Sequence, residues 1–178
     1  FLVTLTRDRE NEKPISMPAT EKEKNTASTD SYQSDDTRIK NLAKEIVGEE
    51  TDFIKIVGLL KSWVFDNLSP TWKKNESSAI RVLENLAGDC TEYTLLFVSL
   101  ARSLGMPARE AFGLKYSVDP YPTFTQHAWA EVFDGEYWIS IDPSWDQLIV
   151  DVGHVKLDDE ITMEPLEKTL GLLSKDIS

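Results

Sequence analysis

The sequence predicts an α+β domain, with helices in the first part of the chain and an antiparallel sheet in the second. Apolar residues recur at helical spacing from Ile39 to Leu86, and a nearly all-apolar segment follows from Thr91 to Leu104. Beyond it, short alternating segments between Arg109 and Ile141 are separated by turn residues, as in paired strands. The 178 residues, 40% of them apolar and 10% aromatic, suffice for one domain with a hydrophobic core.

Two amphipathic helices are expected to open the domain. Apolar residues stand at positions i, i+3, i+4, i+7 and i+8 from Ile39, and a second set begins at Phe53. Pro70 interrupts this pattern. Ser77 or Ser78 is then expected to cap a third helix.

The segment from Thr91 to Leu104 is predicted to be a buried central helix, because it is apolar nearly all round and contains neither Pro nor Gly. Gly105 and Pro107 follow it and mark its end. Strands are expected over three later segments, at 109–116, 126–133 and 136–141.

The flanks of the chain differ from this domain in composition. Residues 1–9 are interpreted as the remnant of a preceding domain, and residues 10–36 as a linker, because they are polar and mixed in charge. Residues 37–157 then form the domain, and residues 158–178 a tail with a possible short helix at 166–173. The chain is therefore expected to be part of a larger multidomain protein.

Composition argues against several classes of function. With 19 Lys and Arg against 31 Asp and Glu, the net charge is −12 and the densest basic run is Lys73-Lys74, so no nucleic-acid partner is expected. No run approaches the roughly 20 apolar residues of a membrane-spanning helix. Cys90 is the single cysteine, which excludes an internal disulfide and a thiolate zinc site. The run Asp158-Asp159-Glu160 lacks the alternating ligands of an EF-hand, so no metal or cofactor is expected.

Cys90 lies at the predicted start of the central helix. The helix dipole and unpaired backbone N–H groups stabilise a thiolate there, which favours the reactive anion. These N–H groups, that of Thr91 among them, are also candidate donors to an oxyanion. An inert structural thiol is the alternative, and position alone does not decide between the two.

The predicted hairpin supplies partners for this thiol. Asp134-Gly135 is a strong signal for a two-residue turn, and counting along both strands from such a turn places His127 opposite Asp142. Opposed side chains share a face and lie roughly 5 Å apart, so the carboxylate would hold the imidazole in one tautomer. This is the base and its orienting acid of a catalytic triad, with Cys90 as the expected nucleophile.

Several motifs resemble those of the transglutaminase-like superfamily, which has a papain-type fold. They are Gly88-Asp89-Cys90-Thr91-Glu92, the segment 100–109, His127-Ala128-Trp129-Ala130-Glu131-Val132, and Trp138 with Asp142-Pro143. The resemblance covers about residues 36–157. It implies Cys90 as nucleophile, His127 as general base and Asp142 as orienting acid, with the cysteine helix packed against the sheet. Residues 151–157 resemble the segment that follows the triad in bacterial members, which favours a cell-envelope or secreted protein.

Further residues are weaker candidates. Trp129 shares a sheet face with His127 and is expected either to wall the substrate channel or to lie in the core. Trp72 is a candidate indole donor to the oxyanion, as a tryptophan is in some members of the resembled family. Glu92 is expected to cap the helix, and His154 to be structural.

The trio Cys90, His127 and Asp142 supports acyl transfer on a peptide or protein substrate, through a thioester that water or an amine resolves. Water gives a peptidase or amidase, and a lysine amine gives a cross-linking transglutaminase. Hydrolysis is favoured, because an extended amine-binding element has no evident place in so short a domain. A non-catalytic interaction domain that keeps the fold is the alternative from another class.

Overall fold

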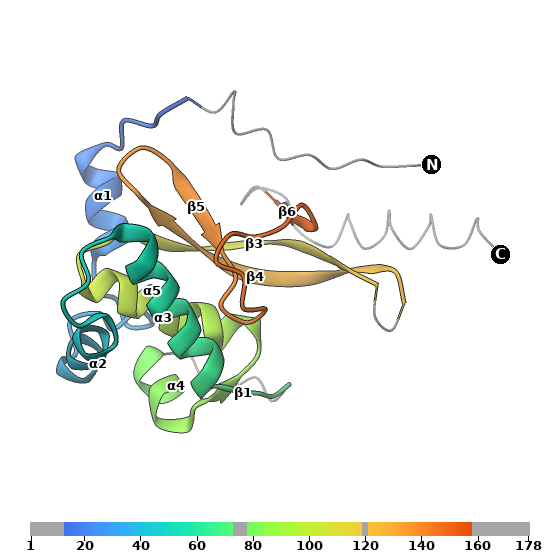
Figure 1. The fold of residues 1–178 in the computed structure, drawn as a ribbon, viewed down its shortest axis with the longest axis horizontal. Helices are drawn as coiled ribbons and strands as arrows, with labels where there is room; N and C mark the ends of the chain where they lie inside the picture. The colour runs from blue at the N-terminus through green and yellow to red at the C-terminus, as the bar shows by residue number, and fades with distance from the viewer. Residues whose placement is uncertain (1–12, 73–77, 119–120, 158–178) are drawn as a thin grey trace.

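The predicted order of helices before strands is confirmed in the computed structural model, which describes residues 13–72, 78–118 and 121–157. Figure 1 shows the helices gathered on one side of a long pair of strands. The helices are α1 (Ala19–Thr26), α2 (Thr37–Val47), α3 (Phe53–Asn67), α4 (Ala79–Asn85) and α5 (Cys90–Ser103). The strands are β1 (Ser69–Pro70), β2 (Ala87–Gly88), β3 (Ala108–Ser117), β4 (Thr123–Phe133), β5 (Trp138–Ile141) and β6 (His154–Lys156).

The two expected amphipathic helices are α2 and α3, and each begins at an aspartate that satisfies a free backbone N–H. Asp36 accepts from the Arg38 N–H at 2.8 Å, and Asp52 accepts from the Lys55 N–H at 3.0 Å. The third expected helix is α4. Ser78 occupies its N-cap position, without a side-chain capping bond.

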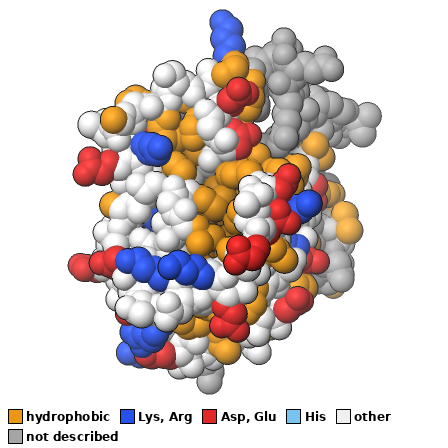
Figure 2. Space-filling model, turned by 60° about the vertical axis from the view of Figure 1, so that its left-hand side comes forward, with side chains coloured by type: hydrophobic (Ala, Val, Ile, Leu, Met, Phe, Trp, Pro, Cys, Tyr) orange, Lys and Arg blue, Asp and Glu red, His pale blue; other side chains and the backbone are white. Residues whose placement is uncertain are grey.

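α5 crosses the middle of the domain, as predicted for the apolar segment. Leu96, Phe97, Val98 and Leu100 have no exposed surface, because α2, α3 and α4 pack around the helix and β3 and β4 lie against it. Hydrophobic side chains also reach the surface, where Figure 2 shows them among acidic and basic groups. Within the described ranges no helix combines the length and the apolar character needed to cross a membrane.

The main sheet has four antiparallel strands in the order β5-β4-β3-β6. Alternate residues of β4 serve different faces. Ala130 belongs to the core shared with α5, whereas Trp129 lies in a smaller apolar cluster with Ala111 and Val150. The two edge strands, β5 and β6, flank the segment that leads from Ile141 to His154.

The prediction of a two-residue turn at Asp134-Gly135 is wrong. The loop has four residues, and the Asp134 N–H donates to the Tyr137 carbonyl at 3.1 Å. The Asp134 carboxylate also accepts from the N–H groups of Glu136 and Tyr137, at 2.8 and 2.7 Å. An aspartate that satisfies the loop's own backbone in this way favours the longer turn.

The longer turn shifts the strand register by two residues. Ala130 now faces Ile141, so continuing the same register would place Trp129, and not His127, opposite Asp142. The predicted direct opposition of His127 and Asp142 is therefore wrong. A shift of two keeps every side chain on its predicted face, because the side-chain period of a strand is two.

The segment of linker composition contains a short helix, α1, that its sequence pattern did not predict. Arg102 of α5 donates to the Ala27 carbonyl at 2.9 Å, and its guanidinium lies 4.5 Å from the centre of the Tyr32 ring. The Tyr32 hydroxyl donates to Glu110 of β3 at 3.1 Å. These contacts hold part of the segment against the domain, and its assignment as a linker stays a prediction.

Other predicted features lie outside the described residues. They are the alternative cap Ser77, the domain remnant at 1–9, the acidic run Asp158-Asp159-Glu160 and the tail helix at 166–173.

Glu110 provides a test of how the segment with Tyr32 is held. Burial raises the pKa of Glu110 from 4.5 to about 7. Between these values the folded state binds a proton that the unfolded chain has lost, so the free energy of unfolding falls as pH rises through this window. We expect Glu110→Gln to remove this part of the decline, because an amide does not titrate and still accepts from Tyr32.

The measurement is urea denaturation between about pH 5 and pH 8. Glu45→Gln, a change on the exposed side of α2, is the control and keeps the decline. Equal pH slopes for Glu110→Gln and the wild type would contradict the expectation.

Candidate active site

Cys90 is the first residue of α5, and the chain around it is fixed by a reciprocal cap. The Asp89 carboxylate accepts from the Thr91 N–H at 2.9 Å and from the Glu92 N–H. Glu92 in turn accepts from the Asp89 N–H at 2.8 Å. This capping box confirms the expected capping role of Glu92.

The capping box requires glycine at position 88. A Cβ atom there would lie 2.2 Å from the Cβ of Glu92, far inside contact distance. Gly88 also belongs to β2, which pairs in parallel with β1, and its carbonyl accepts from the Thr71 N–H at 2.9 Å. Trp72 follows Thr71 in the chain, so this short pairing places Trp72 beside the start of α5.

His127 and Asp142 are hydrogen-bonded despite the shifted register. Nε2 of His127 lies 2.6 Å from Oδ2 of Asp142. His127 is part of β4, and Asp142 directly follows β5, where it forms an isolated bridge with Gln147. The two residues meet diagonally across the sheet face, a separation that long side chains can span.

The Asp142 carboxylate has no exposed surface and accepts from several donors. Its Oδ1 binds the Ser144 N–H at 2.9 Å, the Ser144 hydroxyl at 2.8 Å and the Trp145 N–H at 3.2 Å. Its Oδ2 binds His127 and, at 2.9 Å, Nε2 of His154. Burial alone would raise the pKa of Asp142, but the hydrogen bonds from the two imidazoles and Ser144 outweigh it and hold the pKa well below its usual range.

His127 links this carboxylate to the thiol. Its side chain is hydrogen-bonded to Cys90 as well as to Asp142. Burial alone would lower the pKa of His127, but these two hydrogen bonds and the negative charges of both partners raise it to about 9. Since Asp142 engages Nε2, Nδ1 is the nitrogen that faces Cys90.

A cavity of about 530 Å³ opens at Cys90. His127 and Trp145 line it, as does Trp72, whose side chain is 93% exposed. Trp72 and Cys90 therefore line the same cavity, and the role of Trp72 as an oxyanion donor stays a prediction. Ser144 lines this cavity and is hydrogen-bonded to Asp142.

Thr91 and Trp129 are not brought to this cavity. The Thr91 N–H is occupied by the Asp89 cap, which removes it as an oxyanion donor. Trp129 is 1% exposed and lies behind His127, with ring centres 6.3 Å apart. The structure thus favours the core alternative for Trp129 over a channel wall.

His154 is the site residue that sequence reasoning missed, since it was expected to be structural. A histidine in a short strand far along the chain gives no pattern that ties it to Asp142. The donor atoms of His127, Asp142 and His154 lie within 4.8 Å of one another, and these are residue types that bind zinc. The same atoms already bond one another, so a metal ion would have to break the His127–Asp142 bond.

Comparison with known proteins agrees with this geometry. The sequence profile of the transglutaminase-like superfamily matches residues 40–143, more than half of the chain. The chain belongs to this superfamily. The match includes Cys90, His127 and Asp142, the three residues that the structure connects by hydrogen bonds.

Solved structures share the transglutaminase-like fold. A candidate cysteine protease from Cytophaga hutchinsonii superposes with a TM-score of 0.64 at 23% identity, over 83% of this chain and 50% of that one. The periplasmic domain of TgpA from Pseudomonas aeruginosa superposes with a TM-score of 0.59 at 20% identity, over 74% and 49%. An uncharacterized protein of Haemophilus influenzae is 25% identical over 151 residues, 71% of this chain. The chain spans only 39% of that protein's length.

Gly88 allows a test of the local geometry at this transglutaminase-like site. We expect Gly88→Ala to reduce the free energy of unfolding by about 1–3 kcal/mol, because the added methyl group collides with Glu92. It should also slow alkylation of Cys90, since the cap that orients the cysteine is displaced.

The matched control is Gly58→Ala in α3. A Cβ there meets only the Leu148 methyl groups at ordinary contact distances of 3.8 and 3.9 Å. Alanine also favours a helix, so this variant should be as stable as the wild type or more so. Equal thermal stability of the two variants would contradict the role given to Gly88.

Proposed function

We propose that this domain is a thiol-dependent acyl-transfer enzyme that acts on peptide or amide bonds, with Cys90, His127 and Asp142 as its catalytic residues. The observation that supports the proposal most directly is the continuous chain of hydrogen bonds from Cys90 through His127 to the buried Asp142, with Cys90 and His127 at the wall of a cavity. Nucleophile, base and orienting group are thus within hydrogen-bond reach of one another.

The reaction uses the protonated state of His127 that its raised pKa favours. The Cys90 thiolate attacks the amide carbonyl carbon and forms a C–S bond, and the carbonyl oxygen becomes an oxyanion. His127, protonated at Nδ1, gives its proton to the leaving nitrogen as the C–N bond breaks. Water then attacks the thioester and gives a proton to His127, and cleavage of the C–S bond returns the thiolate.

The Cys90 N–H is the donor best placed for the oxyanion. The N–H groups of Thr91 and Glu92 bind the Asp89 carboxylate, and that of Tyr93 binds the Asp89 carbonyl. Among the described residues nothing accepts from the Cys90 N–H. Trp72, on the wall of the same cavity, is the candidate for a second donor.

Hydrolysis is the favoured outcome. Transfer to an amine in water requires a dry site and a bound acceptor. The tryptophans at the cavity, Trp72 and Trp145, are 93% and 49% exposed, so the described walls leave the thiol side of the cavity open to water. The name of one structural neighbour, a candidate cysteine protease, agrees with a peptidase.

We also propose a location in the cell envelope and a place within a larger protein. The support is a structural neighbour that is a periplasmic domain, together with a match that spans about half of each solved chain.

The test is incubation of a peptide library with the protein, followed by mass spectrometry. We expect new carboxyl ends or deamidated glutamines that are absent with Cys90→Ala, and little incorporation of an added primary amine. Abundant amine incorporation that needs Cys90 would instead indicate a cross-linking transglutaminase. No turnover of any kind would favour an interaction domain that keeps the fold.

The pH profile tests the role of Asp142. His127 must be protonated to assist the leaving amine, and its pKa of about 9 predicts that kcat/KM declines as pH rises through that value. In Asp142→Asn the charge that raises this pKa is gone and burial of the ring dominates. The alkaline limb should therefore move to lower pH, and kcat should fall.

The control is Glu45→Gln on the exposed side of α2, which removes a charge outside the loop and the cavity. An unchanged alkaline limb in Asp142→Asn would contradict the assigned role.

A further inference from the structure

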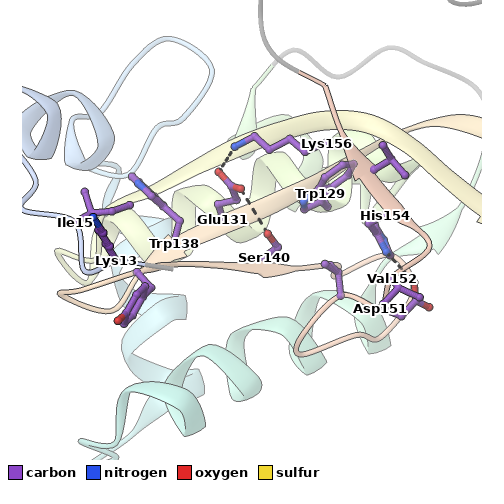
Figure 3. A pocket seen from close by; sticks show the side chains of 13 residues that line it. Lys13, Ile15, Trp129, Glu131, Trp138, Ser140, Asp151, Val152, His154 and Lys156 are labelled. Carbon is purple, nitrogen blue, oxygen red and sulfur yellow. Dashed lines mark hydrogen bonds and ion pairs between the residues drawn. The ribbon is translucent and has the colours of Figure 1, made fainter. Parts of the chain in front are cut away.

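His154 occupies an unusual place relative to the proposed triad. Its side chain has no exposed surface, and Nε2 lies 2.9 Å from Oδ2 of Asp142, the oxygen that also binds His127. Its other nitrogen, Nδ1, lies 3.2 Å from Oδ1 of Asp151. Figure 3 shows His154 near Trp129, with the contact to Asp151 drawn as a dashed line.

The chemistry of the carboxylate determines which atom donates in the bond between His154 and Asp142. An ionised carboxylate has only acceptors, so Nε2 of His154 must donate to Asp142. Oδ2 thus receives one imidazole N–H from His127 and one from His154. Both positions on this oxygen are filled, which stabilises its negative charge and fixes the direction from which it is approached.

Asp151, the second partner of His154, is itself held. Its carboxylate accepts from Lys115 of β3 at 2.9 and 3.0 Å, from Gln147 at 2.9 Å and from the Gly153 N–H at 2.8 Å. The contacts are therefore continuous along the series His127, Asp142, His154, Asp151 and Lys115. His154 connects the triad to a firmly anchored group.

The contact joins the two edges of the sheet. Asp142 follows β5 and His154 begins β6, and these are the outer strands of the order β5-β4-β3-β6. β6 approaches closely because of Gly113, where a Cβ would lie 2.1 Å from the Val155 carbonyl and 2.7 Å from the Trp129 ring. The ring of His154 packs at right angles to that of Trp129, with centres 5.3 Å apart.

We propose that His154 is a positioning residue of the acyl-transfer site, which holds Oδ2 of Asp142 ionised and aimed at His127. This inference rests on the function proposed above. The Ser144 and Trp145 donors fix only Oδ1, and they come from the loop that carries Asp142. His154 fixes Oδ2 from a separate strand, β6. It therefore determines whether the Asp142 carboxylate points at the imidazole of His127.

Two variants separate positioning from a merely structural role. In His154→Gln the longer amide can place an N–H where Nε2 stood, and so keep the bond to Asp142. In His154→Asn the shorter amide reaches Asp151 but not Asp142. The chain has two histidines, so either variant leaves His127 as its single imidazole, and the NMR titration of that ring is unambiguous.

In His154→Asn we expect the proton affinity of His127 to drop about tenfold or more, because burial of the ring is no longer outweighed by a well-aimed carboxylate. Alkylation of Cys90 by iodoacetamide near pH 6 should slow by about the same factor. For any peptide that the wild type cleaves, kcat should fall with little change in KM. His154→Gln should retain most of each property.

An unchanged His127 titration in His154→Asn, or equal losses in the Asn and Gln variants, would overturn the proposal. Circular dichroism checks that both variants fold. If neither folds, the wild-type spectrum decides: low-field imidazole N–H signals from both histidines support the proposal, and a signal from His127 alone overturns it.

Titration and alkylation need no substrate, so the two proposals can fail separately. Suppose that His154→Asn changes the His127 titration and the rate of Cys90 alkylation, but the wild type turns over no peptide. This result would refute the hydrolase function and leave the positioning of His127 supported. Normal cleavage by His154→Asn would refute the positioning role and leave the function intact.

Discussion

The site depends on one buried charge, the carboxylate of Asp142. An ionised group without solvent exposure is strongly destabilising unless hydrogen bonds and opposite charge compensate it. Here the compensation comes from three separate parts of the fold: the backbone and hydroxyl after β5, His127 on β4 and His154 on β6. Against the effect of burial, hydrogen bonds from all three parts lower the pKa of Asp142, so the site is complete only in the fully folded sheet.

Two buried lysines extend this constraint to the loop that follows Asp142. Lys61 of α3 is 6% exposed and binds Asp146, and Lys115 of β3 is 4% exposed and binds Asp151. Buried lysines are rare unless paired. Each one ties the loop to a different layer of the domain, so the helices and the sheet both take part in holding the loop that carries Asp142.

Cys90, the proposed nucleophile, is positioned by a different kind of constraint, which is local. Gly88, Asp89 and Glu92 form a tight cap that occupies the N–H groups of Thr91 and Glu92, while the Cys90 N–H has no acceptor in the part of the chain that the structure describes. The cap therefore both starts the central helix and determines which N–H is available for the proposed oxyanion contact. The rest of α5, from Glu92 to Arg102, is buried.

The contrast between Cys90 and His154 explains how much of the site the sequence could predict. The helix that begins at Cys90 follows from a run that is apolar nearly all round, lacks Pro and Gly and ends at Gly105, which are local signals. The shared face of His127 and Asp142 follows from the two-residue period of strands, and it survived an error of two in the register. The family motifs around these three residues led to the same trio.

Only the tertiary structure decided the contacts among these elements. The Asp134 side chain lengthened the turn, so Asp142 meets His127 diagonally and lies nearer Trp129 along the strands. The short pairing of β1 with β2 brought Trp72 to Cys90, and the close approach of β6 at Gly113 brought His154 to Asp142. Patterns of spacing report which face a residue occupies, because they arise from local backbone geometry. Which faces meet depends on loop closure and sheet curvature, and these are set by packing between residues far apart in the chain.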